Sequence, residues 1–305
     1  MPLTIFKVFD HISGHGFCNY LTTINAINAR ASCRYFKALI TDYPWNDLYT
    51  HIDGSLYLWR ICFPLASSCN ISGRRDLVDN DFIYLRGIKM LNMSMCDQSG
   101  ITNNAFSYLI GIYALDMSWC DQFSISNNAF QYLTGIHTLN MSWCNQPNIT
   151  DDAFQYLIGI HTLDMSHCRQ DNITDHAFSY LCGINTLNIS GCTQETITDK
   201  AFSYLSRIYF LNMSYCSQRT ITDHAFSRLS GIHTLNICWC IQSTITDGAF
   251  IHLSGIHTLN MCCCIQSTIT DDIITYLGGI HTLNIRYCNQ LTPTAFLALG
   301  GIIVI

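Results

Sequence analysis

NITDDAFQYLIGIHTLDMSHCRQD, residues 148–171, is one copy of a sequence that recurs along most of the chain. The cysteine near its end returns at positions 96, 120, 144, 168, 192, 216, 240, 264 and 288, so every step is 24 residues. A fixed period of this length indicates a repeat protein in which each copy is one small supersecondary unit. Nine units follow one another from Leu77 without a gap, and a partial tenth begins at Leu291.

The first half of each unit predicts a short helix. In residues 149–159, Thr150 is a favourable N-cap residue, and Phe154 and Leu157 share one apolar face. Gly159 then ends the helix. The second half, residues 160–168, alternates apolar and polar side chains, which predicts a short strand with one buried face and one exposed face.

No single unit buries enough apolar surface to fold alone. Its core of about eight side chains contributes roughly 1.5–3 kcal/mol each at full burial. Ordering the 24 backbone residues of a unit costs on the order of 1–2 kcal/mol apiece. Stacked neighbours remove this deficit. The expected fold is therefore α/β: a curved solenoid over residues 77–305, with one parallel sheet inside and short helices outside.

The strand half carries a known pattern. Ile160, Leu163, Met165 and Cys168 have the spacing L-x-x-L-x-L-x-x-N/C, which is the signature of leucine-rich repeats. The form with cysteine in the last position, followed by ITD and a short helix, resembles the cysteine-containing leucine-rich repeats best known from F-box proteins. The resemblance covers residues 77–305 and is far more specific for fold than for function.

The repeated cysteine has a structural interpretation. It stands where the chain turns inward after the strand, and a small, weakly polar side chain that packs there also bonds to loop backbone. The chain has 17 cysteines but no basic start followed by an apolar run, so we expect reduced thiols in a cytosolic protein. The sequence has no C-x-x-C spacing, and we expect neither a metal nor a cofactor.

Residues 1–50 differ from the repeats and resemble an F-box. The segments LTIFKVFDHI and ASCRYFKALITDYPWNDL follow the apolar spacing of that motif, with a proline near the start and a D-x-P-W sequence near the end. By this resemblance, the residues that bind an adaptor protein are Pro2, Ile5, Phe9, Ile12, Phe36, Leu39, Pro44 and Trp45. Residues 51–76 would then be a linker and N-terminal cap. The alternative is that residues 1–50 only cap the solenoid.

The resemblance implies a function. The F-box would hold the adaptor of a cullin-type, SCF-like ubiquitin ligase, the repeats would hold a target protein, and the chain would be a non-catalytic substrate-receptor subunit in the cytoplasm. Near-identical repeats rich in Ile, Asn and Tyr also resemble proteins of large amoeba-infecting DNA viruses, in which case the cytoplasm is that of the host. The alternative function is a free-standing protein–protein interaction scaffold without ligase coupling.

Strand side chains that point away from the core line the concave face, in columns with one member per unit. The column that contains Trp119 varies most and holds three Trp and two Tyr. Aromatic residues are typical hot spots of protein interfaces. The residues predicted to bind a target are Trp119, Asn140, Trp143, Asp164, His167, Tyr215, Trp239 and Tyr287.

Each column also has an interpretation that needs no ligand. The aromatic residues can stack on one another and shield the cysteines, and the Asn/Asp column can form a ladder between strands. A partial histidine column can bind metal or sense pH, although duplication of one unit explains it more simply. Cys238 and Cys262 are neighbours that can oxidise, or bind metal together with Cys263, which gives a third class of function, a redox or metal-binding protein.

Composition limits the other classes. A net charge of −6 with no basic block argues against nucleic acid as the main partner. No run of 18 apolar residues predicts a membrane span. No catalytic motif is present, so we do not expect an enzyme.

The end of the chain suggests self-association. Leu299, Gly301 and Ile302 align with Leu277, Gly279 and Ile280, which sets Ile303 and Val304 at the positions of His281 and Thr282. An apolar last strand would leave an uncovered sheet edge, which invites pairing with another chain through residues 291–305.

Overall fold

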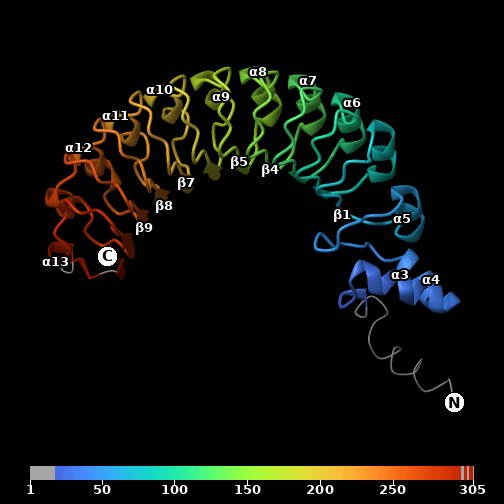
Figure 1. Cartoon of the computed structure of the whole chain (residues 1–305). Coiled ribbons are helices and arrows are strands. Elements are labelled where there is room, and N and C mark those ends of the chain that lie inside the picture. The colour runs from blue at the N-terminus through green and yellow to red at the C-terminus, as the bar shows by residue number, and fades with distance from the viewer. Residues whose placement is uncertain (1–17, 297–298, 301, 305) are drawn as a thin grey trace, which may run out of the picture.

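A computed structural model describes residues 18–296, 299, 300 and 302–304. The repeats stack side by side into an arc, with the strands on its inner face and the short helices on its outer face (Figure 1). The strands form one parallel sheet in sequence order: β1 Ser68–Asn70, β2 Met90–Asn92, β3 Ala114–Asp116, β4 Thr138–Asn140, β5 Thr162–Asp164, β6 Thr186–Asn188, β7 Phe210–Asn212, β8 Thr234–Asn236, β9 Thr258–Asn260, β10 Thr282–Asn284 and β11 Ile302–Val304. The predicted solenoid, with its sheet inside and its helices outside, is confirmed.

The 24-residue period fixes the register of this sheet. Leu139 pairs with Leu163, and Leu163 with Leu187, so equivalent residues lie side by side in successive strands. In β2 to β10 the central leucine is buried, together with the isoleucine that begins most units and the phenylalanine of most helices. One continuous apolar core therefore runs along the arc.

The α-helices of the repeats have only four or five residues each. A typical unit has one α-helical turn followed by a 3-10 turn. The α-helical turns are α6 Asn103–Phe106, α7 Asn127–Phe130, α8 Asp151–Phe154, α9 Asp175–Ser179, α10 Asp199–Phe202, α11 Asp223–Phe226, α12 Asp247–Phe250 and α13 Pro293–Phe296. The 3-10 segments are η1 Asp79–Leu85, η2 Ser107–Leu109, η3 Gln131–Leu133, η4 Gln155–Leu157, η5 Ile251–Leu253 and η6 Asp271–Tyr276. No helix in the described part of the chain is long and apolar enough to cross a membrane.

Hydrogen bonds between helix starts join neighbouring units. The Thr150 hydroxyl caps α8 by accepting from the backbone N–H of Asp152. The carboxylate of Asp151 accepts from both the backbone N–H and the hydroxyl of Thr174 in the next unit, each at 2.7 Å. The ITD sequence therefore has two roles, because its threonine caps its own helix and its aspartate holds the next threonine in place.

The cysteine ladder also joins neighbouring units, and its predicted structural role is confirmed. The thiol of Cys144 donates to the backbone oxygen of Met117 in the preceding unit, and each ladder cysteine from Cys96 to Cys288 repeats this contact at 3.0–3.2 Å. Burial raises the pKa of the Cys144 thiol well above its usual value, which keeps the proton that this bond requires.

A buried glutamine two residues after the cysteine has a similar role that the sequence analysis missed. Gln146 and Gln170 donate through Nε2 to the backbone oxygens of Cys120 and Cys144 in the preceding units. A polar side chain in an apolar core requires such partners. The invariance of this glutamine across the nine units was the available signal.

Two helices lie in the described part of residues 1–50, and the assignment of this segment to an F-box stays a prediction. Helices α3 Thr23–Ser32 and α4 Arg34–Thr41 pack as a hairpin, and α5 Leu56–Cys62 follows. The solenoid then begins earlier than Leu77, because β1 lies within residues 51–76 and pairs in register with β2.

The C-terminal alignment made from the sequence is wrong. Ile302, Ile303 and Val304 form β11 and pair with Thr282, Leu283 and Asn284. Ile303 therefore takes the register position of the core leucine, not that of His281, because the last connection is two residues shorter than the alignment assumed. Self-association through residues 291–305 stays a prediction.

Candidate functional site

The concave face is narrow because each strand has three residues. The first and third residues of a strand face away from the core, and only the second is buried. The first position is threonine in most units, but it is Met90 in β2, Ala114 in β3 and Phe210 in β7. The third position is the Asn/Asp column, to which the predicted target residues Asn140 and Asp164 belong.

The Asn/Asp column serves mainly to turn the chain within each unit. In Asp164, Oδ1 accepts from the backbone N–H of Ser166 at 2.9 Å, and Asn140 does the same for Ser142. Short Asn and Asp side chains favour such turns. Among the described residues, the one side-chain hydrogen bond between members of the column runs from Asn188 Nδ2 to Asp164 Oδ2 at 2.8 Å. The interpretation of this column as a continuous ladder between strands is therefore wrong.

The aromatic column lies in the turn just after the strands, not on the strands themselves. We call it the strand-end ladder; its members are Met95, Trp119, Trp143, His167, Gly191, Tyr215, Trp239, Cys263 and Tyr287. All of them have a positive φ, between 57° and 67°. Six of the eight residues predicted to bind a target belong to this ladder, so the structure brings them into one row.

Rings of the strand-end ladder stack. The ring centroids of Trp119 and Trp143 are 4.4 Å apart, and those of Trp143 and His167 are 4.1 Å apart. Stacking alone does not hide them, since Trp119 is 47% exposed and Tyr215 is 51% exposed. Burial, and then the charge of Arg169, lower the pKa of His167, so this ring is neutral at pH 7.

A second row of rings lies just before the strands. We call it the strand-start ladder; its members are Tyr113, His137, His161, Tyr209, His233, His257 and His281. His137 and His161 stack at 4.6 Å, and the Nδ1 of each lies 3.0–3.1 Å from the hydroxyl of the following threonine. Desolvation and the neighbouring histidines lower the pKa of His257. Within the residues that the structure describes, no group of three His, Cys, Asp or Glu side chains has a metal-binding arrangement.

Both ladders are interrupted at β6. Asn185 precedes this strand where β3 to β5 and β7 to β10 are each preceded by a ring, and Gly191 follows it. The imidazole of His167 covers Gly191 so closely that a Cβ there would lie 2.4 Å from the ring. A side chain at this position would have to displace the His167 ring. The rings on either side of Gly191 form two separate stacks.

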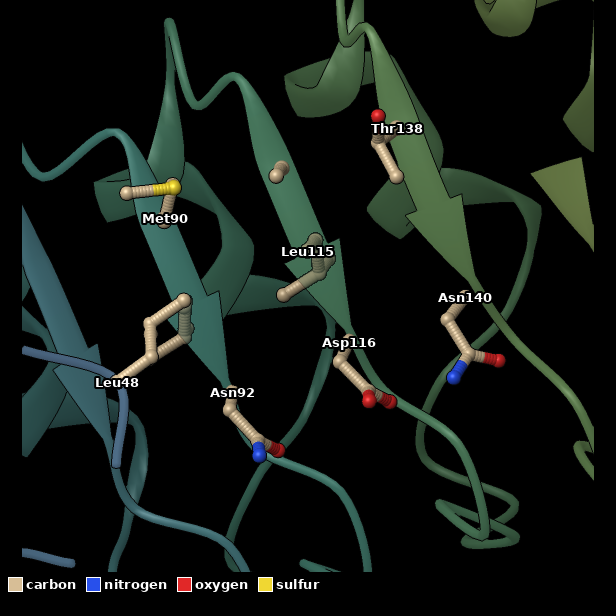
Figure 2. A pocket seen from close by; sticks show the side chains of 9 residues that line it. Leu48, Met90, Asn92, Leu115, Asp116, Thr138 and Asn140 are labelled. Carbon is tan, nitrogen blue, oxygen red and sulfur yellow. The ribbon is translucent and has the colours of Figure 1, made fainter. Parts of the chain in front are cut away.

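A pocket of about 250 Å³ opens on the concave face near its N-terminal end. Its walls are Leu48, Met90, Leu91, Asn92, Ala114, Leu115, Asp116, Thr138 and Asn140. Figure 2 shows these side chains along β2, β3 and β4, with Leu48 contributed by the segment that precedes the solenoid. Of the predicted target residues, only Asn140 lines it. The sequence analysis missed Leu48, Ala114 and Asp116; the signal for Ala114 was the loss of the usual threonine.

The predicted adaptor residues do not share one environment. Trp45 is buried, donates from Nε1 to the hydroxyl of Thr23 at 3.0 Å, and packs against Phe63. Phe36 and Leu39 are half-buried beside the core, and Pro44 is exposed. Pro2, Ile5, Phe9 and Ile12 lie outside the described residues.

A second apolar pocket, of about 600 Å³, lies between α3 and α5. Ile24, Ile27, Leu58 and Ile61 line it, and each is more than 40% exposed. Exposed apolar side chains in such a cluster are typical of a contact surface.

Cys238 and Cys262 form a disulfide across β8 and β9, with their Cα atoms 4.7 Å apart. The expectation that all thiols are reduced is therefore not met in this structure. Of the alternatives for this pair, oxidation is the one observed; Cys263 is a free, buried thiol in the strand-end ladder.

Comparison with known sequences and the geometry both indicate leucine-rich repeats. A family described as "BspA type Leucine rich repeat region" matches residues 123–257 in six copies. The match covers the units from α7 to α12. The fold is a leucine-rich-repeat solenoid. No curated protein sequence matches the chain.

Solved structures share this leucine-rich-repeat fold at low sequence identity. An internalin, InlF of Listeria monocytogenes, is 15% identical with a TM-score of 0.65 and aligns over 100% of this chain and 91% of its own. The Toll–Spatzle complex of Drosophila is 12% identical with a TM-score of 0.60, over 84% of this chain and 38% of that one. A complex of TLR13 with ssRNA13 is 18% identical with a TM-score of 0.62, over 80% and 36%.

These likenesses concern the fold alone. The chain spans less than half the length of the TLR13 and Toll structures. Because the TLR13 complex contains an RNA, the comparison lends no support to our expectation that nucleic acid is not a partner. No catalytic family is among the matches described here.

Proposed function

We propose that this leucine-rich-repeat solenoid is a binding protein that holds a protein target along its concave face, with the strand-end ladder as the main contact. The observation that carries the proposal is the conformation of this ladder. Non-glycine residues at a φ near +60° cost roughly 1–2 kcal/mol each, yet Trp119, Trp143 and Trp239 adopt it. The equivalent position of another unit holds Gly191, and glycine adopts a positive φ without this cost. Trp119 and Trp239 are exposed and Trp143 is half-buried. Large rings that are at least partly exposed at strained positions favour a role in contact.

A protein is a better target for this surface than a nucleic acid. Stacked rings also suit nucleobases, but the chain has a net charge of −6, and phosphate binding needs clustered Lys and Arg. Solved complexes of this fold include one of Toll with Spatzle and one of TLR13 with ssRNA13.

The finer proposal concerns coupling to a ubiquitin ligase. In it, the N-terminal helices dock the adaptor of a cullin-type ligase, and the chain acts in the cytoplasm, that of the host if it is viral, as a non-catalytic receptor for the bound target. Two observations support it: α3 and α4 form a hairpin where the F-box resemblance expects helices, and exposed apolar residues gather between α3 and α5. A free-standing scaffold is the alternative.

The concave-face proposal is tested by replacing Trp119, Trp143 and Trp239 together with glycine. Glycine is chosen because Gly191 already occupies an equivalent position, so the turn is retained. We expect affinity capture from cell extract, followed by mass spectrometry, to lose its specific protein partners while the circular dichroism spectrum is unchanged. A partner set identical to that of the wild type would contradict the role of the ladder, and capture of RNA alone would contradict a protein target.

The adaptor proposal needs variants that spare the solenoid. Trp45 is unsuitable because its buried ring packs on Phe63 and donates to Thr23, so its loss would disturb the core beside the solenoid. Phe36→Ala with Leu39→Ala should instead abolish binding to a purified adaptor in calorimetry, whereas the exposed Lys37→Ala on the same helix should not. If the wild-type chain binds no adaptor, the scaffold alternative takes its place.

A further inference from the structure

The pocket on the concave face exists because one side chain is small. At the first strand position, the units from β4 to β10 have threonine or, in β7, phenylalanine, whereas β3 has Ala114. Met90 and Thr138 flank this alanine in the sheet. The space left open has Leu91 and Leu115 in its floor, so its base is apolar.

The outer wall of the pocket is held in place from the N-terminal helices. Asn70 donates from Nδ2 to the backbone oxygen of Leu48 at 2.8 Å. The preceding residue, Asp47, accepts from the backbone N–H and hydroxyl of Thr23 at the start of α3. The hydrogen bonds of Leu48 with Asn70 and of Asp47 with Thr23 thus hold the Leu48 side chain over the sheet as a wall of the pocket.

A carboxylate lies at the polar side of this apolar space. Oδ1 of Asp116 accepts from the backbone N–H and the hydroxyl of Ser118. Within the described part of the chain, Oδ2 of Asp116 accepts no hydrogen bond and Asp116 is in no ion pair, whereas Oδ2 of Asp164 accepts from Asn188. Its neighbours in the column, Asn92 and Asn140, are neutral.

We propose that this pocket receives one long basic side chain, Lys or Arg, of the protein target. The inference rests on the proposed function and names a feature of the target. The methylene groups would lie along Met90, Ala114 and Leu48, and the cationic head would reach Asp116 Oδ2. Lys and Arg bury their stems against apolar surface in this way while the charge stays at a polar edge, and a carboxylate is the preferred acceptor for both heads.

The size and charge of the pocket exclude other occupants. At about 250 Å³ it is smaller than the roughly 300–1,000 Å³ of small-molecule sites, so it suits one side chain. An acidic side chain would meet Asp116 with like charge. A purely apolar side chain would desolvate the carboxylate without a partner, which is unfavourable.

The test uses the full chain with methyl-¹³C methionine, so that the Met90 methyl group reports on the pocket. The probes are N-acetyl-arginine N-methylamide and its neutral isostere N-acetyl-citrulline N-methylamide. We expect a saturable shift of the Met90 signal with the arginine probe, with a Kd on the order of millimolar. Binding of the citrulline probe should be about three- to tenfold weaker, because the charge is lost. Met90→Leu assigns the signal.

Three variants locate the binding. Ala114→Thr restores the residue of the neighbouring units and should abolish the shift without loss of stability. Asp116→Asn should reduce arginine binding to the level of citrulline. Asp164→Asn, the matched control in the same column, should leave it unchanged. No saturable shift, equal binding of both probes, or an unaltered shift in Asp116→Asn would each overturn the inference.

The pocket experiment and the capture experiment test different claims and can fail independently. If the pocket fails these tests while the triple glycine variant of the strand-end ladder still loses its captured partners, the protein-target proposal stands and only the basic side chain falls. If the triple glycine variant keeps all of its captured partners, the protein-target proposal is contradicted, whatever the pocket experiment shows.

Discussion

The thiol of Cys168 donates to the backbone oxygen of Met141 at 3.1 Å and thereby ties one repeat to the repeat before it. Both groups are buried, so neither can turn to water if the other is removed. The ladder of such contacts is a feature of the interfaces between units, and interfaces between units carry the stability of a solenoid.

We therefore predict that Cys168→Ala lowers the free energy of unfolding by about 1–3 kcal/mol, because it leaves the Met141 oxygen without its partner. Cys168→Ser keeps a donor and should recover part of this loss. Hydrogen exchange of the amides around residues 141–168 measures the effect locally. Equal protection in Cys168→Ala and in the wild type would show that the thiol only fills space.

The strand-end ladder makes a second prediction, concerning backbone strain. Trp143 has a φ of 61°. Trp143→Ala loses stacking worth roughly 0.5–1.5 kcal/mol and keeps the strain, whereas Trp143→Gly loses the stacking but relieves strain of roughly 1–2 kcal/mol. The glycine variant should be the more stable of the two by about 1 kcal/mol in thermal unfolding. A more stable alanine variant would mean that the turn rearranges.

Much of the fold followed from the period, because a gap-free 24-residue repeat leaves one register for a parallel sheet. The shared roles of Asp151 and of the buried glutamines were missed because each bonds to a neighbouring unit, and a single unit read alone does not reveal its neighbour. The C-terminal register failed for a related reason, since a shortened last connection breaks the period on which the alignment relied.

The candidate site was predictable in part. The aromatic column was recognised from its composition. Its position in the turn after the strand was not predicted, because the sequence pattern extended the strand past Asp164, where it ends, to Ser166 and His167. The pocket depends on Leu48, which reaches the concave face from outside the repeats. No repeat pattern predicts such a contact.

The third prediction concerns acid stability. Burial tends to raise the pKa of Asp47, but hydrogen bonds from Thr50 and Thr23 outweigh it and lower the pKa from 3.8 to about 2. A carboxyl whose pKa is lower in the folded state stabilises the fold above its unfolded pKa and loses that contribution as pH falls. The N-terminal helices should therefore loosen between about pH 4 and pH 2, as followed by tryptophan fluorescence. Asp47→Asn should flatten this transition, and an unchanged profile in that variant would assign it to other groups.

The fourth prediction concerns Cys238 and Cys262. A reducing cytosol opposes their disulfide, so the proposed cytoplasmic role requires both thiols to be reduced in cells. Rapid alkylation at cell lysis followed by mass spectrometry reads their state, with the exposed Cys182 as the positive control for labelling. A disulfide present at lysis would indicate an oxidising compartment and contradict the ligase proposal. Cys238→Ser, which restores the residue of most other units, should fold normally in either case.

The central claim is that a protein target lies against the strand-end ladder. The most direct test places a photo-crosslinking benzoylphenylalanine at position 143 and, as a matched control, at position 155, which is exposed on the outer face. The account predicts that illumination in cells joins the chain to a discrete protein from position 143 and not from position 155. Crosslinks of the same protein from position 155 alone, or none from position 143 in cells where the chain captures a partner, would contradict it.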